Sequence, residues 1–162
     1  MRAMRVLRLV VHAPSRQPVL VLGEVDGDRC VPVFLRGPQA QVISLGARDE
    51  EVQPPLTQDV IVPIVEGLGR RIEGVEITEL SGGTFSADIV FDAGTRVAAR
   101  PSDALSIAVR DSLPIGMAED ILDDVGQSIA ELFPDGGDAP PEEQIKEFRE
   151  FIDDVTPDDF KD

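Results

Sequence analysis

The sequence contains no tryptophan and no tyrosine, and phenylalanine occurs only seven times. It also has one cysteine, Cys30, and one histidine, His12. A single cysteine excludes a disulfide within the chain, and its apolar neighbours favour a buried thiol over a reactive one. With one residue of each kind, neither a histidine-rich zinc site nor a Cys–His nucleophilic pair is expected. Any chemistry is therefore expected to use carboxylates, arginines and hydroxyls.

Long apolar runs are also absent from the sequence, so no membrane-spanning segment is predicted. Arginines at positions 2, 5 and 8 interrupt the first residues, and no signal peptide is recognisable there. These two absences predict a cytoplasmic protein. What the chain does have is enough aliphatic side chains for a core, because its 162 residues are 42% hydrophobic, which fits one globular domain.

Acidic side chains outnumber basic ones by 16, but the excess is concentrated near the C-terminus. Residues 1–117 hold 12 arginines against 15 acids, a net charge of −3, whereas residues 118–162 hold 3 basic residues against 16 acids, a net charge of −13. The body of the chain is thus close to neutral. The total charge is consequently a weak argument against a phosphate-bearing ligand on that body.

The pattern of apolar residues and turns predicts two hairpins, at 19–35 around Asp26-Gly27-Asp28 and at 75–91 around Ser81-Gly82-Gly83. Pro32 predicts an edge or bulge position in the first hairpin, because proline cannot donate a ladder hydrogen bond. The other expected elements are strands at 4–12, 96–99 and 113–117, and helices at 39–47, 57–68, 101–111, 119–125 and 142–155. The predicted fold is α+β: a mostly antiparallel sheet or partial barrel with three or four helices and an acidic C-terminal helix.

Residues 134–141 are rich in glycine, proline and aspartate, which predicts a linker between a domain at 1–133 and an acidic tail at 142–162. An apolar stripe of Phe148, Phe151 and Ile152 makes the predicted tail helix amphipathic. Three roles remain open for this helix: packing on the domain or another subunit, docking into a partner, or occupying a substrate groove as an anionic mimic. The stripe and the two hairpins together predict a homodimer or higher homo-oligomer.

The segment Arg100-Pro101-Ser102-Asp103-Ala104 lies where a predicted strand ends and a predicted helix begins. Arg100 and Ser102 can bind a phosphate there, and Asp103 can ligate Mg²⁺ or Mn²⁺ or orient a water. Alternatively, Ser102 or Asp103 caps the helix while Arg100 pairs with a carboxylate. Asp59 has two similar interpretations: a second carboxylate facing Asp103 across a cleft, or a first-turn acid beside a Thr57 cap.

Several stretches of the chain resemble the bifunctional nuclease family in order and spacing, over roughly residues 5–125. They are Pro18–Gly23, Val31–Val33, Pro55–Asp59, Thr84–Ala87 and Arg100–Arg110, the last followed by Pro114-Ile115. The resemblance implies cleavage of DNA and RNA. Together with the residue chemistry, it makes Asp103, Asp59 and Arg100 the catalytic candidates and Arg100 and Ser102 the substrate-binding candidates, with a divalent cation (Mg²⁺ or Mn²⁺) at Asp103 or Asp59.

One position departs from the family's pattern. Where the family usually reads Leu-Thr-His-Asp, this chain has Gln58, which removes an imidazole that could act as a base or metal ligand. An activity that requires that imidazole would be weak or lost here. The alternative function is a non-catalytic regulatory or protein-binding module that uses the fold for homo-oligomeric assembly. The lack of tyrosine and tryptophan for base stacking, and of any basic cluster denser than Arg70-Arg71, favours this alternative.

Overall fold

The structure is a computed structural model and describes residues 1–49 and 54–133. Its elements are β1 (Arg2–His12), β2 (Gln17–Glu24), β3 (Arg29–Phe34), α1 (Gly37–Ser44), η1 (Gln58–Val60), α2 (Ile61–Gly67), β4 (Ile72–Ser81), β5 (Thr84–Phe91), η2 (Asp92–Gly94), β6 (Arg96–Ala99), α3 (Pro101–Asp111), β7 (Ile115–Met117), α4 (Glu119–Val125), β8 (Gln127–Ser128) and α5 (Ile129–Leu132). The predicted linker at 134–141 and acidic helix at 142–162 lie outside the described residues.

The eight strands form one sheet in the order β6-β5-β4-β7-β1-β2-β3-β8. Every neighbouring pair is antiparallel except β4 and β7, which are parallel. The predicted α+β class and both predicted hairpins, now β2–β3 and β4–β5, are confirmed. Of the two predicted forms, the sheet is the correct one, because β6 and β8 end it and do not pair to close a barrel. Pro32 lies on an edge as expected, since β8 pairs only with Arg29 and Cys30.

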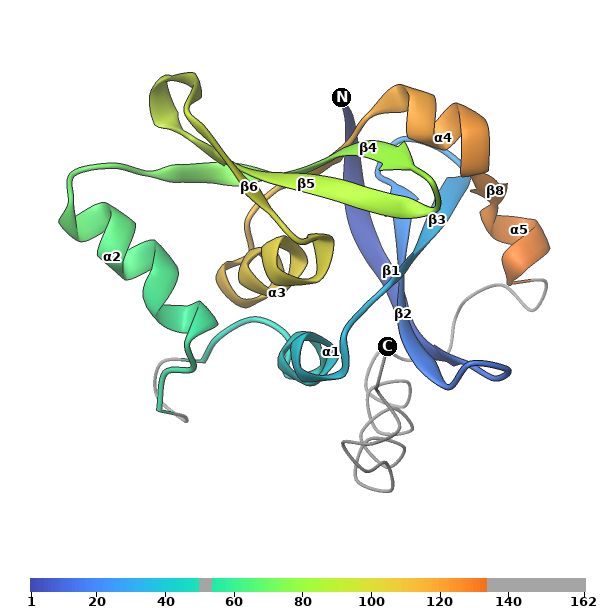
Figure 1. Cartoon of the computed structure of the whole chain (residues 1–162), viewed down its shortest axis with the longest axis horizontal. Coiled ribbons are helices and arrows are strands. Elements are labelled where there is room, and N and C mark those ends of the chain that lie inside the picture. Colours follow the sequence, from blue (N-terminus) through green and yellow to red (C-terminus); the bar gives the residue numbers. More distant parts are fainter. Residues whose placement is uncertain (50–53, 134–162) are drawn as a thin grey trace.

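Helices α1 and α3 contact each other and cover one face of the sheet, while α4 and α5 follow β7 on the other side of the molecule (Figure 1). The main core lies between the sheet and these helices, and its fully buried side chains include Leu20, Leu22, Ile77, Leu105 and Met117. β2 is buried on both faces. Its alternate residues Val19 and Val21 pack with Cys30 in a second, smaller cluster.

Two helix ends differ from the prediction for local reasons. α1 stops at Ser44, before the expected end at 47, because Gly46 adopts a left-handed conformation (φ 71°) that terminates the helix. The helix expected at 57–68 is instead a 3-10 turn, η1, followed by α2. The expected cap residue, Thr57, makes no side-chain cap hydrogen bond. The Asp59 carboxylate accepts a hydrogen bond from the Leu56 amide (2.9 Å) and closes the turn. Pro63 falls in the first turn of α2, where its missing N–H costs no helical bond. The helices expected at 101–111 and 119–125 are confirmed.

Among the described residues, no helix is both long enough and apolar enough to span a membrane.

Candidate functional site

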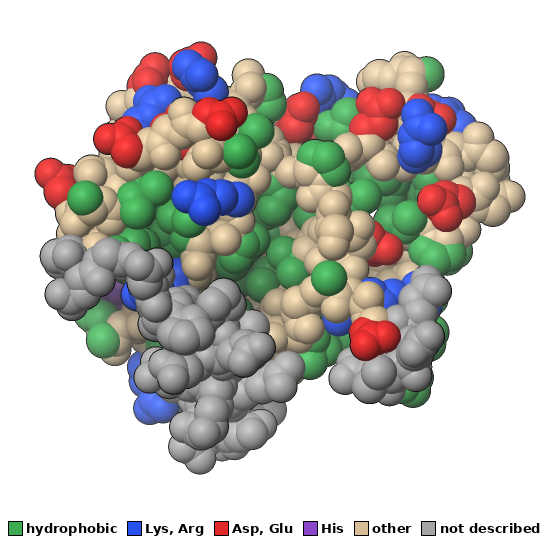
Figure 2. Space-filling view, turned by 180° about the vertical axis from the view of Figure 1, so that it is seen from behind, with side chains coloured by type: hydrophobic (Ala, Val, Ile, Leu, Met, Phe, Trp, Pro, Cys, Tyr) green, Lys and Arg blue, Asp and Glu red, His purple; other side chains and the backbone are tan. Residues whose placement is uncertain are grey.

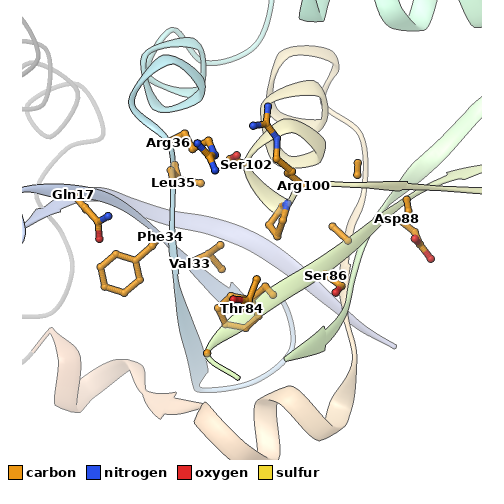
Figure 3. Close-up of a pocket in the computed structure, with 16 residues that line it drawn as sticks. Gln17, Val33, Phe34, Leu35, Arg36, Thr84, Ser86, Asp88, Arg100 and Ser102 are labelled. Carbon is orange, nitrogen blue, oxygen red and sulfur yellow. The ribbon is translucent and has the colours of Figure 1, made fainter. Parts of the chain in front are cut away.

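A groove of about 670 Å³ lies where the N-termini of α1 and α3 face strands β3, β5 and β6 (Figure 3). Its floor and sides are mostly apolar, and its polar side chains come from three places. Arg36, Arg100 and Ser102 gather at the helix end, and Thr84, Ser86 and Asp88 lie along β5 (Figure 3). Gln17 of β2 adds an amide beside Phe34. The groove therefore combines cations, hydroxyls and one carboxylate around an apolar floor.

Arg100 is held in the lining by Asp103. Its Nε donates a hydrogen bond to Asp103 Oδ2 (2.6 Å), and Gln39 Nε2 of α1 donates to Asp103 Oδ1 (2.8 Å). The ion pair with Asp103 raises the pKa of the Arg100 guanidinium. Asp103 itself is not one of the lining residues. The carboxylate thus ties α1 to α3 and orients the arginine that faces the groove.

The two helices begin in the same way. Each has a proline in its first turn, Pro38 in α1 and Pro101 in α3, and each has an arginine at the N-cap that makes no side-chain cap hydrogen bond. The helix start expected at 101 is therefore correct, whereas neither Ser102 nor Asp103 caps it. Uncapped N-termini present backbone N–H groups and the positive end of the helix dipole to the groove, where an anion is stabilised.

Asp59 lies elsewhere, fully buried against Arg110 of α3. Arg110 Nε donates to Asp59 Oδ1 (2.7 Å) and Nη2 donates to Oδ2 (3.0 Å), while Nη1 donates to the Gly46 carbonyl (3.1 Å). The guanidinium of Arg110 holds the pKa of the Asp59 carboxyl below its usual value. This pair ties the loop before α2 to α3 and to the end of α1.

The structure therefore brings Arg100, Ser102 and Asp103 together but leaves Asp59 apart from them. Asp103 and Arg110 are seven residues apart on α3, which places them roughly 10 Å apart along the helix axis. Asp59 follows Arg110 to the far end of the helix and faces no open cleft. Gln58, where the family usually has histidine, precedes Asp59 in η1 and is likewise not a lining residue.

Sequence reasoning missed six residues at this site: Phe34, Arg36, Gln39, Phe85, Ser86 and Asp88. Asp88 looked like an ordinary polar residue of an alternating strand, and its place in the lining depends on how β5 meets β3. Arg36-Gly37-Pro38 does carry a signal, because it repeats the arginine-before-proline start of α3. In residues 1–49 and 54–133, no three His, Cys, Asp or Glu side chains are grouped as for a metal ion.

The model of the bifunctional nuclease domain matches residues 20–130, which include both helices and every groove-lining residue except Gln17. This chain belongs to the bifunctional nuclease domain family. The resemblance found in the motifs is thereby confirmed. The chain is also similar in sequence to two uncharacterized proteins of Mycobacterium tuberculosis, one from strain CDC 1551 and one from strain H37Rv. Each is 40% identical to this chain over 166 residues, and the match covers 99% of this chain and 99% of the relative.

Proposed function

We propose that this member of the bifunctional nuclease domain family hydrolyses phosphodiester bonds of DNA and RNA in the groove between α1, α3 and β5. The observation that carries the proposal is Arg100, placed in the lining at an uncapped helix N-terminus and held there by Asp103. A guanidinium and a helix N-terminus together favour an oxyanion of a phosphate group.

Four of the lining residues have a part in the proposed reaction: Arg100, Ser102, Ser86 and Asp88. With Nε bonded to Asp103, the terminal NH₂ groups of Arg100 offer a planar pair of donors for phosphate oxygens. The hydroxyls of Ser102 and Ser86 donate further hydrogen bonds to the phosphate. Asp88 has a side chain that is 25% exposed and an Oδ2 that lies 3.6 Å from Nη1 of Arg96, and it accepts a proton from the attacking water. The water oxygen bonds to phosphorus, the phosphorus–oxygen bond to one nucleoside breaks, and the leaving oxygen takes up a proton.

Asp88 would act as the base when no cation is bound, and would instead hold the divalent cation expected from the resemblance when one is present, because Asp88 lines the groove and Asp103 does not. Both carboxylate oxygens of Asp103 already accept hydrogen bonds, one from Arg100 and one from Gln39. Mg²⁺ is commonly held by one or two carboxylates together with the phosphates of the substrate, so Asp88 and the bound phosphate would hold it here. When bound, the cation would supply positive charge to the phosphate oxygens. Asp59 has no part in this proposal, because Arg110 covers it.

The test is cleavage of end-labelled DNA and RNA by highly purified protein, with Mg²⁺, with Mn²⁺ and with chelator. Arg100→Ala is expected to lower kcat/KM by about 100-fold, because it removes a charge-assisted contact that strengthens in the transition state. Asp88→Asn is expected to lower kcat by about 10²- to 10⁴-fold, the usual range for a general base. Arg70→Ala is the matched control, since Arg70 is an arginine paired with Asp92 outside the groove lining.

Three outcomes decide the proposal. Loss of cleavage in the Arg100 and Asp88 variants with an unchanged Arg70 variant supports it. Cleavage that stays at the wild-type rate in the double variant Arg100→Ala/Asp88→Asn locates the activity elsewhere or in a contaminant. Wild-type protein that cleaves nothing favours the alternative, a non-catalytic module, for which Gln58 in place of the family's usual histidine is the specific observation.

A further inference from the structure

The groove contains two aromatic rings beside its cations. Phe34, at the end of β3, is 49% exposed, and Phe85, near the start of β5, is half-buried; both are lining residues. Val33 and Leu35, on either side of Phe34, point inward and are buried in the core. The chain therefore places an exposed ring on a strand whose neighbouring residues form a rigid apolar base.

The ring of Phe34 is also supported from the side. The imidazole of His12 meets it edge-on, with ring centroids 5.5 Å apart and an interplanar angle of 78°. His12 is fixed in turn by a hydrogen bond between its Nδ1 and the Ser15 hydroxyl (2.7 Å). A ring held in this way loses less side-chain entropy when a ligand packs on it. Figure 3 shows Phe34 on the same groove as Arg36, Ser102 and Arg100.

We propose that the groove binds single-stranded nucleic acid, with unpaired bases stacked on Phe34 and Phe85 and the phosphate backbone bound at Arg100. This inference rests on the proposed function, and it specifies the substrate class. Sites for single strands combine cations that follow the backbone with aromatic rings on which bases stack, and every base has a π-face. In a duplex each base face is covered by its neighbours, so the rings can contact it only after unpairing. Phenylalanine here provides the stacking surface that tyrosine and tryptophan cannot, since the sequence has neither.

The measurement is fluorescence anisotropy of the full chain with a 12-nucleotide single-stranded DNA and with the corresponding 12-base-pair duplex, in chelator so that cleavage does not interfere. The single strand is expected to bind at least 10-fold more tightly than the duplex. Phe34→Ala is expected to weaken single-strand binding by roughly 5- to 100-fold, the loss of one stacked base. Phe34→Leu keeps an apolar side chain but loses the flat ring, and is expected to weaken binding to a similar extent.

Val25→Ala is the matched control, because Val25 is 48% exposed in the β2–β3 loop and is not a groove residue. Phe34→Trp restores a flat ring and is expected to bind the single strand at least as tightly as the wild type. Equal affinity for single strand and duplex, or unchanged affinity in both Phe34→Ala and Phe34→Leu, overturns the proposal. The affinity of Phe85→Ala is interpreted together with the melting temperature of that variant, since Phe85 also packs on the core and its loss can destabilise the fold.

The same samples separate this inference from the nuclease proposal. Binding that depends on Phe34, without cleavage after addition of Mg²⁺ or Mn²⁺, rejects the nuclease and retains the single-strand site. Cleavage that depends on Arg100 but proceeds equally on single strands and duplexes, whatever stands at position 34, rejects the single-strand site and retains the nuclease.

Discussion

The carboxylate of Asp59 and the guanidinium of Arg110 are each buried almost completely, with side-chain exposures of 1% and 3%. Asp59→Ala leaves the Arg110 charge buried without its partner. We expect the free energy of unfolding to fall by about 3–5 kcal/mol, measured by urea denaturation. Glu119→Ala is the control, because it breaks the exposed Arg2–Glu119 pair and should cost far less. A loss from Asp59→Ala no larger than from Glu119→Ala would contradict the prediction.

The same pair gives the protein a pH-dependent stability at acid pH. The pKa of Asp59 is lowered from 3.8 in the folded state, chiefly by its hydrogen bonds from Arg110. The unfolded state therefore takes up this proton first as the pH falls, and stability is lost as the pH drops from about 3.8 through the folded-state pKa. The urea concentration at the unfolding midpoint, measured from pH 6 to pH 2.5, should therefore decrease over this pH range. Asp59→Asn should remove that component, and an unchanged pH profile in this variant would reject the assignment.

Asp111 contributes a pH dependence of stability with the opposite sign to that of Asp59, because desolvation by burial raises the pKa of Asp111. A folded-state pKa above the unfolded one means that stability falls as the pH rises between the two values. Asp111→Asn removes a buried charge whose Oδ2 has no hydrogen-bond partner among the described residues. The variant is therefore expected to have a higher urea midpoint than the wild type at pH 7 and a smaller advantage at pH 3. A lower midpoint at pH 7 would show that the carboxylate is stabilising.

Sequence reasoning found Arg100 and Asp103 as a pair because they are three residues apart, within one turn of a helix. It could not find the partner of Asp59, since Arg110 lies 51 residues away and only the tertiary fold brings it close. The same limit hid Gln39, which is 64 residues from Asp103. Local spacing thus predicts the identity of candidate residues, while their roles depend on long-range contacts.

At the scale of elements, α3 carries both ends of this arrangement, with Arg100 before its first turn and Arg110 in its last. The helix ends at Ser112, which adopts a left-handed conformation (φ 53°) that disfavours side chains with a Cβ. Ser112→Gly is therefore expected to raise the free energy of unfolding by about 0.5–1 kcal/mol in urea denaturation. Gly46→Ser, which introduces the same strain at the end of α1, should lower it. Equal stability of both variants and the wild type would refute the strain argument.

Elements with strong local signals were predicted well. The helices at 101–111 and 119–125 have clear starts and apolar spacing, and the hairpins have tight turns rich in glycine or aspartate. The parallel pairing of β4 with β7 was not predictable, because it joins strands separated by β5, β6 and α3. The expected strand at 113–117 begins only at Ile115, because the Leu113 amide still donates to the Ala108 carbonyl of α3 and Pro114 has no N–H to donate.

At the scale of the whole molecule, the site depends on the curvature of the sheet. Four strands separate β3 from β5 in the sheet order, yet both line one groove. The sheet must curl to bring them together, without the edge pairing that would make a barrel. Figure 2 shows basic and acidic side chains interleaved over one face of the molecule, with hydrophobic side chains in its recesses. This agrees with the nearly neutral body computed from residues 1–117.

One apolar surface remains exposed at the β6 end of the sheet. Ile64, Leu68 and Val97 are 56%, 77% and 48% exposed, and the latter two line a pocket of about 220 Å³ beside α2. Exposed apolar side chains beside an edge strand favour self-association. We expect a dimer of about 35 kDa, twice the 17.5 kDa chain, in light scattering at micromolar concentration. Leu68→Glu should yield the 17.5 kDa species, and Val25→Glu, at a site 48% exposed in the β2–β3 loop, should not. A wild-type protein that shows only the 17.5 kDa species would contradict the prediction of a dimer.

The acidic C-terminal residues lie outside the described structure, and their negative charge is expected to lower the affinity of the groove for single-stranded DNA. Deleting residues 138–162 removes ten acids and three bases and changes the net charge from −16 to −9. The truncated chain is expected to bind single-stranded DNA more tightly at low salt, because less negative charge repels the strand, and the gain should shrink as salt screens that repulsion. As a control, replacing Phe148, Phe151 and Ile152 by serine keeps every charge and should leave the affinity unchanged. If truncation lowers the melting temperature without changing the affinity, the tail stabilises the fold through its apolar stripe. In that case its charge does not screen the groove from the strand.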